Sequence, residues 1–215
     1  MDLMNLFKTN SNFIINPLND FFPRGITKGS IIQIVGDVES GKTSFAYDIM
    51  KLNEDKVFMY IDTYFTATPP NLENIFLVRT NLENEIISII ENLPINSVDV
   101  LIIDSASNIL LNAEENRITS FTDFFMKLAI LLASKKISCI LINTLNGVGK
   151  PSNMSYQATS QLAASFLISC TFEKDKNIYK LTPLKSKYLN EEKEYVIMRW
   201  YYELWMGIFR LSKPR

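Results

Sequence analysis

A short segment near the N-terminus carries the residue types and the spacing that bind phosphate groups. It reads Gly36-Asp37-Val38-Glu39-Ser40-Gly41-Lys42-Thr43-Ser44, and the part ending at Thr43 matches the pattern G-x-x-x-x-G-K-[ST]. In this pattern backbone N–H groups surround the phosphates of a nucleotide, the lysine contacts the β- and γ-phosphates, and the last hydroxyl binds Mg²⁺. We therefore predict a nucleotide-binding loop at residues 36–44, with Thr43 as a Mg²⁺ ligand.

The sequence around this loop has the order of elements that a phosphate site requires. An apolar run at residues 31–35 predicts a buried strand before the loop, and residues 43–52 have the spacing of a helix after it. This strand–loop–helix order separates a binding site from a chance match to the pattern, which is the alternative interpretation. The N-terminus of the helix adds N–H groups that point at bound phosphate.

Asp104 is the best candidate for a carboxylate that organises the Mg²⁺ shell. It ends the apolar run at residues 98–104, which predicts a buried strand with an acidic tip, the usual context of a Walker B aspartate. The alternative is that Asp104 is a turn residue or a helix cap, because serines follow it. In open α/β sheets ligands bind outside the carboxyl ends of the strands. Four residues at such ends are therefore expected to converge on one site: Gly36, Asp62, Asp104 and Asn143.

Strands and helices alternate along most of the chain, which predicts an α/β fold. Expected strands cover residues 31–35, 57–62, 98–104 and 137–143, and expected helices cover residues 43–52, 83–93 and 118–134. Continuous apolar strands separated by helices predict a mainly parallel sheet with helices on both faces. Three later β-rich stretches, at residues 166–173, 177–182 and 195–201, predict antiparallel strands added at the C-terminal edge. Residues 1–28 are interpreted as an N-terminal lead-in segment and residues 29–215 as the core domain.

The composition limits the classes of function. The chain has 215 residues, of which 47% are hydrophobic, and this suits one globular domain. Its net charge of −1 provides no global field that attracts nucleic acid, and the absence of histidine excludes imidazole chemistry. Cys139 and Cys170 lie in apolar runs, which predicts buried free thiols in a reducing compartment. No signal-peptide pattern or membrane-length apolar run is present, so we expect an intracellular protein without membrane contact.

The ordered set of motifs resembles the core of the RecA-family recombinases. The resemblance covers about two-thirds of the chain and rests on residues 25–36, Tyr60-Ile61-Asp62-Thr63, Leu101-Ile102-Ile103-Asp104-Ser105-Ala106, Leu141-Ile142-Asn143 and residues 158–174. It implies a RecA-like P-loop ATPase core with ATP and Mg²⁺ as cofactors. The family's N-terminal domain and its Phe-x-x-Ala polymerisation motif do not occur in this sequence. The chain therefore resembles the core-only recombinase paralogues, including the archaeal RadB type.

This resemblance implies a function and partners. Recombinase paralogues assist a recombinase in homologous recombination and DNA repair, usually in a complex with another RecA-family member. The implied location is the nucleus in a eukaryote and the cytoplasm in an archaeon. In the family, single-stranded DNA runs along the loop that corresponds to residues 144–157, so Lys150 and Tyr156 are candidate DNA contacts. The alternative for the lysines of this region is a solvated face that protects an exposed sheet edge.

Two positions depart from the family pattern. The family has a catalytic glutamate, which activates the attacking water, where this chain has Tyr64, and a γ-phosphate-sensing glutamine where this chain has Thr144. A phenol with a pKa near ~10 is a poor base at neutral pH. We therefore expect ATP binding with slow or absent hydrolysis. The alternative is a shifted register, in which Asp62 or another carboxylate is the base.

Other functional classes remain open from the sequence. One alternative is an active P-loop enzyme, either a RecA-type ATPase of the KaiC kind or a small-molecule kinase, although no arginine cluster typical of a kinase lid is present. Another is a structural adaptor that retains the nucleotide for folding alone. A C-terminal aromatic cluster that includes Trp200 and Trp205 is interpreted either as core packing or as a partner surface.

Overall fold

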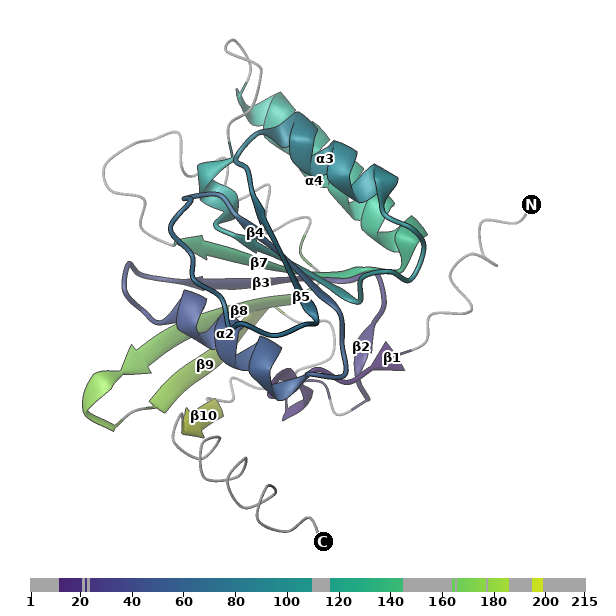
Figure 1. The fold of residues 1–215 in the computed structure, drawn as a ribbon. Helices are drawn as coiled ribbons and strands as arrows, with labels where there is room; N and C mark the ends of the chain where they lie inside the picture. Colours follow the sequence, from purple (N-terminus) through teal and green to yellow (C-terminus); the bar gives the residue numbers. More distant parts are fainter. Residues whose placement is uncertain are drawn as a thin grey trace, which may run out of the picture.

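The computed structural model describes residues 12–20, 22, 24–109, 117–144, 164, 166–176, 178–185 and 195–198. The strands of its main sheet are β3 (Ile31–Gly36), β4 (Phe58–Asp62), β5 (Ile75–Arg79), β6 (Val100–Asp104), β7 (Ser138–Thr144), β8 (Phe166–Glu173), β9 (Ile178–Lys185) and β10 (Tyr195–Met198). They form an eight-stranded sheet in the order β10-β9-β8-β3-β7-β6-β4-β5 (Figure 1). The six strands from β8 to β5 are parallel, and β9 and β10 are antiparallel additions at one edge. The expected α/β class is therefore confirmed, and the expected antiparallel strands are confirmed for β9 and β10. β8, which was expected among them at residues 166–173, instead pairs in parallel with β3.

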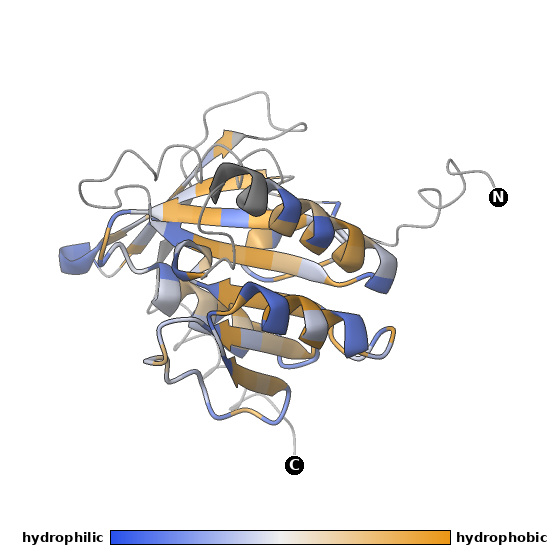
Figure 2. Ribbon diagram, turned by 90° about the horizontal axis from the view of Figure 1, so that it is seen from above, coloured by the Kyte–Doolittle hydropathy of each residue, from blue (hydrophilic) through white to orange (hydrophobic). Residues whose placement is uncertain are grey.

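Helices cover both faces of this sheet. They are α2 (Lys42–Leu52), α3 (Glu83–Asn92) and α4 (Arg117–Lys135), and short 3-10 helices lie at Leu18–Asp20, Ala106–Asn108 and Lys174–Lys176. In Figure 1, α3 and α4 lie together on one face and α2 lies on the other. Between these layers the strands are largely hydrophobic along their whole length (Figure 2). A strand buried on both faces has to be continuously apolar, which explains the sequence pattern.

Side chains of each strand alternate between two cores. In β4, Phe58 and Tyr60 belong to the core under α2, whereas Met59 and Ile61 belong to the core under α3 and α4. On α4, the side chains of Phe124, Phe125, Leu128 and Leu132 are buried in the core under this helix. Cys139 and Cys170 are buried free thiols, as expected.

Part of the lead-in segment packs directly on the core. β1 (Asn12–Phe13) pairs in antiparallel fashion with β2 (Ile26–Thr27). Between them, Ile15 and Leu18 are fully buried in the core under α2. Residues of the lead-in therefore complete this core. Within the described residues, no helix has the length and the apolar character needed to span a bilayer.

One strand of the sheet was not expected from the sequence. β5 is the edge strand beside β4, and its apolar side chains are unusually exposed, with Phe76 at 53% and Leu77 at 39%. A one-sided edge strand lacks both the burial and the alternating pattern that mark a central strand. The run Ile75-Phe76-Leu77-Val78 was the available signal, but it follows the Pro69-Pro70 break closely.

Candidate functional site

The predicted loop connects β3 to α2 at the carboxyl end of the sheet. Gly36 is the last residue of β3, and Gly41 immediately precedes α2. Asp37, Val38 and Glu39 form the exposed outer part of the loop, whereas Ser40 is buried. Thr43 and Ser44 lie in the first turn of α2 and are half-buried. The strand–loop–helix order expected around the motif is therefore present.

Both glycines of the motif are required by close packing. A Cβ atom on Gly36 would lie 2.3 Å from the carbonyl oxygen of Cys170 and 2.4 Å from the Oγ atom of Ser40. Gly41 has a φ of +83°, a left-handed conformation that favours glycine, and a Cβ atom there would lie 2.9 Å from the Cβ atom of Phe172. The loop is therefore built as a tight backbone turn against β8.

Lys42 lies inside the curve of this loop. Its ammonium group donates hydrogen bonds to the carbonyl oxygen of Gly36 at 3.0 Å, to the Oγ atom of Ser40 at 3.1 Å and to the carbonyl oxygen of Asp37. Burial lowers the pKa of Lys42 below its ordinary value, and neighbouring acidic groups, Asp104 among them, act in the opposite direction. A cation held inside a backbone turn is suited to binding an anionic group.

Asp104 forms the acidic side of the candidate site. The hydroxyl of Thr43 donates to its Oδ2 atom at 2.6 Å, and the hydroxyl of Tyr60 donates to the same atom at 2.6 Å. The role of helix cap, which was the alternative for Asp104, belongs to Ser105, whose side chain accepts from the N–H group of Ser107. The structure thus brings the motif threonine and the predicted carboxylate into direct contact.

Tyr60 is a part of this cluster that sequence reasoning missed. Its side chain is fully buried, and its hydroxyl is bonded to Asp104. Burial, together with the negative charge of Asp104, raises the pKa of Tyr60 far above its ordinary value, so the hydroxyl stays protonated and donates. The available signal was a tyrosine in an otherwise apolar strand, because a buried tyrosine hydroxyl usually finds a partner.

Asp62 has a different set of partners from Asp104, although the two residues are register neighbours on β4 and β6. Its Oδ1 atom accepts from the N–H group of Tyr64 at 3.1 Å, and its Oδ2 atom accepts from the N–H group of Ala67 at 2.8 Å. The Nε atom of Arg79 lies 3.5 Å from the same Oδ2 atom. Asp62 is thus engaged in holding the turn that follows its own strand.

The two departures from the family pattern lie near the same strand ends. Tyr64 follows β4, and its side chain is 53% exposed. Thr144 ends β7 and is the register partner of Gly36, so it lies beside the start of the loop. Thr63 ties the ends of β4 and β6 together, because its Oγ1 atom accepts from the N–H group of Ser105 at 2.8 Å and donates to the carbonyl oxygen of Ser105 at 2.9 Å. The strand ends named in the sequence analysis therefore lie together at the carboxyl end of the parallel strands.

The candidate DNA contacts Lys150 and Tyr156 lie outside the described residues, as do Trp200 and Trp205. Lysines of the neighbouring β8–β9 hairpin are described, and several are paired with acidic groups. Glu173 lies 2.8 Å from the Nζ atom of Lys176 and 2.6 Å from that of Lys180, and Lys174 lies 4.0 Å from Glu39. These contacts favour the solvated-face interpretation for this hairpin.

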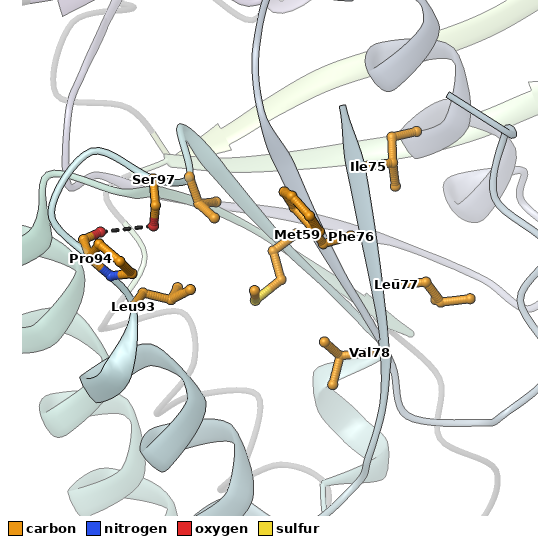
Figure 3. A pocket seen from close by; sticks show the side chains of 9 residues that line it. Met59, Ile75, Phe76, Leu77, Val78, Leu93, Pro94 and Ser97 are labelled. Atoms are coloured by element: carbon orange, nitrogen blue, oxygen red, sulfur yellow. Dashed lines mark hydrogen bonds between the residues drawn. The ribbon is translucent and has the colours of Figure 1, made fainter. Parts of the chain in front are cut away.

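A separate apolar pocket lies at the β5 edge of the sheet. It has a volume of about 500 Å³ and is bounded by β4, β5 and the segment after α3. Figure 3 shows Met59, Phe76 and Val78 on its strand side and Leu93 with Pro94 opposite. The pocket shares no residue with the loop at residues 36–44. It is an apolar surface feature, distinct from the polar cluster around Lys42.

No family model matches this chain, and no curated protein matches its sequence.

Proposed function

We propose that this protein binds ATP with Mg²⁺ through a RecA-like P-loop core and works as a recombinase paralogue. The observation that carries the proposal is the 2.6 Å hydrogen bond between Thr43 Oγ1 and Asp104 Oδ2 beside the buried ammonium of Lys42. A cation inside a backbone turn, a hydroxyl and a carboxylate form the donor set that P-loop proteins use for a triphosphate and its metal. The glycines at Gly36 and Gly41 support the same proposal, because they let the loop turn tightly against β8 in the way that the motif requires.

Each group has a distinct task in this proposal. The N–H groups of residues 37–44 and the ammonium of Lys42 bind the phosphates. Thr43 and Asp104 hold Mg²⁺, directly or through water, and the metal neutralises phosphate charge. Because the Thr43 hydroxyl donates a hydrogen bond to Asp104, the lone pairs of its oxygen remain for the metal.

Slow or absent hydrolysis is the second part of the proposal. Tyr64 replaces the family's catalytic glutamate, and the nearby carboxylate of Asp62 is occupied by two N–H groups and Arg79. The loss of a general base typically lowers a rate by about 10²–10⁴. Nucleotide binding, rather than turnover, is then the main property of the site.

The proposed partner is another RecA-family subunit, and its proposed docking site is the β5 edge of the sheet. In the described sheet β5 pairs only with β4, so its outer backbone groups are open to an added strand. Phe76 is 53% exposed and Ile95 is 65% exposed beside the apolar pocket. An extended apolar segment of a partner fits such an edge. Assistance of homologous recombination and contact with single-stranded DNA through Lys150 and Tyr156 follow from the family resemblance.

The nucleotide proposal is tested with the variant Lys42→Ala and the matched control Lys51→Ala. Lys51 is an exposed lysine in the last turn of the same helix. Loss of a charge-assisted contact to phosphate is expected to lower ATP affinity about 100-fold in Lys42→Ala. Equilibrium binding of a fluorescent ATP analogue measures the effect. Equal affinity in both variants would show that the triphosphate does not bind in this loop.

Turnover separates the functional classes. ATP hydrolysis is measured with and without single-stranded DNA, alone and with proteins that co-purify from the native source. Slow turnover under all conditions supports the paralogue proposal. Fast turnover contradicts it and favours an active P-loop ATPase. Tight ATP binding without DNA affinity, even with the partner present, favours a structural adaptor.

The partner proposal is tested with the variant Phe76→Asp and the control Leu184→Asp. Leu184 is 52% exposed and lies on β9, on the opposite side of the sheet from β5. A charge in the apolar pocket is expected to abolish co-purification with the RecA-family subunit, while ATP binding stays unchanged. If Leu184→Asp has the larger effect on co-purification, the docking place is wrong.

A further inference from the structure

Two tyrosines lie between Asp104 and the segment after β4. The hydroxyl of Tyr60 donates to Asp104 Oδ2 at 2.6 Å, and the ring of Tyr60 packs beside the ring of Tyr47. The N–H group of Thr68 in turn donates to the Tyr47 hydroxyl at 3.1 Å. Tyr47 thus contacts both Tyr60 and the segment after β4.

We infer that Tyr60, held by Tyr47, is a positioning residue that fixes the Asp104 carboxylate for the magnesium ion. This inference rests on the proposed function, because it assigns a role within the same ATP site. It concerns the orientation of one carboxylate, and no catalytic step is assigned to Tyr60.

The geometry at Asp104 explains why a positioning residue is needed. Thr43 and Tyr60 both donate to Oδ2, each at 2.6 Å, from two different elements of the fold. Two donors on one oxygen fix the rotation of the carboxylate, and they leave Oδ1 as the oxygen that can face a metal or its water. Outer hydrogen bonds of this kind orient metal-binding groups and raise metal affinity.

The fold holds Tyr60 firmly in this position. Tyr60 is fully buried on β4, and its ring lies 5.7 Å from the ring of Tyr47 between centroids. Tyr47 lies four residues after Thr43 on α2, so the two side chains share a face of the helix. The same helix face therefore supplies the threonine and the second tyrosine. A shift of α2 relative to β4 would disturb the contact of Thr43 with Asp104 and the contact of Tyr47 with Tyr60 together.

A purely structural role for the hydroxyl makes a different prediction. A buried phenol needs a hydrogen-bond partner in any protein, and removing it would then affect stability alone. A positioning role instead changes how strongly magnesium improves ATP binding. The ratio of ATP affinity with Mg²⁺ to ATP affinity in a chelator distinguishes the two roles.

The test compares Tyr60→Phe and Tyr47→Leu with the control Tyr179→Phe in the full chain. Tyr179 is a fully buried tyrosine whose hydroxyl donates to Asp48 at 3.1 Å, so the control removes the same chemistry away from Asp104. Tyr60→Phe is expected to lower the magnesium-dependent ratio about tenfold, at the lower end of the 10–100-fold range for outer-shell changes. Tyr47→Leu is expected to lower it about threefold, because it removes the ring that packs beside Tyr60. ATP affinity in chelator is expected to stay unchanged in both.

The possible outcomes separate this inference from the proposed function. If the wild type binds no ATP in either condition, the proposed function fails and this inference fails with it. If the wild type shows the magnesium effect and Tyr60→Phe retains it in full, only the inference is overturned. An equal loss of affinity with and without Mg²⁺ also overturns it. If Tyr60→Phe does not fold, as judged by thermal unfolding, an unchanged ratio in Tyr47→Leu overturns the inference.

Discussion

Two aspartates at neighbouring strand ends have opposite environments. Asp62 and Asp104 are register partners on parallel strands, and both side chains are buried. Asp62 accepts from two backbone N–H groups in the turn after its own strand and pairs with Arg79 on the neighbouring strand β5. Asp104 accepts from two hydroxyl groups on other elements, and both contacts fall on one oxygen. Position at a strand end therefore does not by itself decide which carboxylate serves a ligand.

The partners of each carboxylate decide its role. Both oxygens of Asp62 are used to hold a turn, so a change there removes structure. Asp104 retains one oxygen outside its two hydroxyl contacts, so a change there is expected to affect a bound metal. The comparison also bears on the shifted-register alternative, in which Asp62 would be the catalytic base, because turning this carboxylate toward a water would break its contacts with the turn and Arg79. A base needs a free lone pair directed at the attacking water.

The largest expected effect in free energy belongs to Asp62→Ala. This variant leaves the N–H groups of Tyr64 and Ala67 without an acceptor, which costs about 3 kcal/mol of unfolding free energy. The contact with Arg79 adds little, because that side chain is half-exposed. Denaturant unfolding measures the loss. The control is Asp55→Ala, which changes an exposed aspartate. If the folded Asp62→Ala variant lost as much ATP affinity as an Asp104 variant, the contrast between the two aspartates would fail.

Asp104→Asn is expected to have the next largest effect, on binding rather than on stability. The amide oxygen can still accept from Thr43 and Tyr60, but the negative charge is lost. Affinity for ATP with Mg²⁺ is expected to fall about 10–100-fold, which corresponds to about 1.4–2.7 kcal/mol. The unfolding free energy is expected to change by less than about 1 kcal/mol. Titration calorimetry with Mg²⁺ and with a chelator checks the affinity, and denaturant unfolding checks the stability. A pure stability loss would contradict the assigned role.

Tyr64→Glu is expected to have the smallest effect, and it tests the register. A glutamate at this position is expected to raise ATP turnover about tenfold, which is less than a full general-base contribution. The gain is limited because Thr144 still replaces the sensing glutamine. Phe65→Glu is the matched control, since Phe65 is the adjacent residue and is also 53% exposed. An equal increase in both variants would mean that added charge, rather than a positioned base, causes the change.

The central elements of the fold could be predicted from the sequence because their signals are local. β3 was expected at residues 31–35 and is Ile31–Gly36, and α3 was expected at residues 83–93 and is Glu83–Asn92. β10 begins at residue 195 as expected, and residues 199–201 of that stretch lie outside the described part. β5 was missed because an exposed edge strand carries neither burial nor alternation. β9 continues to Lys185, past Pro183, which argued locally against a longer strand.

The candidate site could be predicted only as far as its motif extends. The proximity of Thr43 and Asp104 was expected, because the motif and the acidic strand tip assign both residues to one Mg²⁺ shell. The role of Tyr60 depends on which side of β4 faces α2, and this follows from sheet assembly rather than from local sequence. The engagement of Asp62 depends on Arg79, seventeen residues later on β5, the strand that was not expected. Contacts between distant elements were therefore the part that the sequence could not reveal.

The most direct test of the central claim is titration calorimetry of the folded wild-type chain with ATP and Mg²⁺, beside AMP as control. The account predicts saturable binding of one ATP per chain and much weaker binding of AMP, because Lys42 and the loop contact the β- and γ-phosphates. A flat ATP trace for folded protein, with and without its native partners, would contradict the account. So would equal affinities for ATP and AMP, since a site that ignores the terminal phosphates is not the one described.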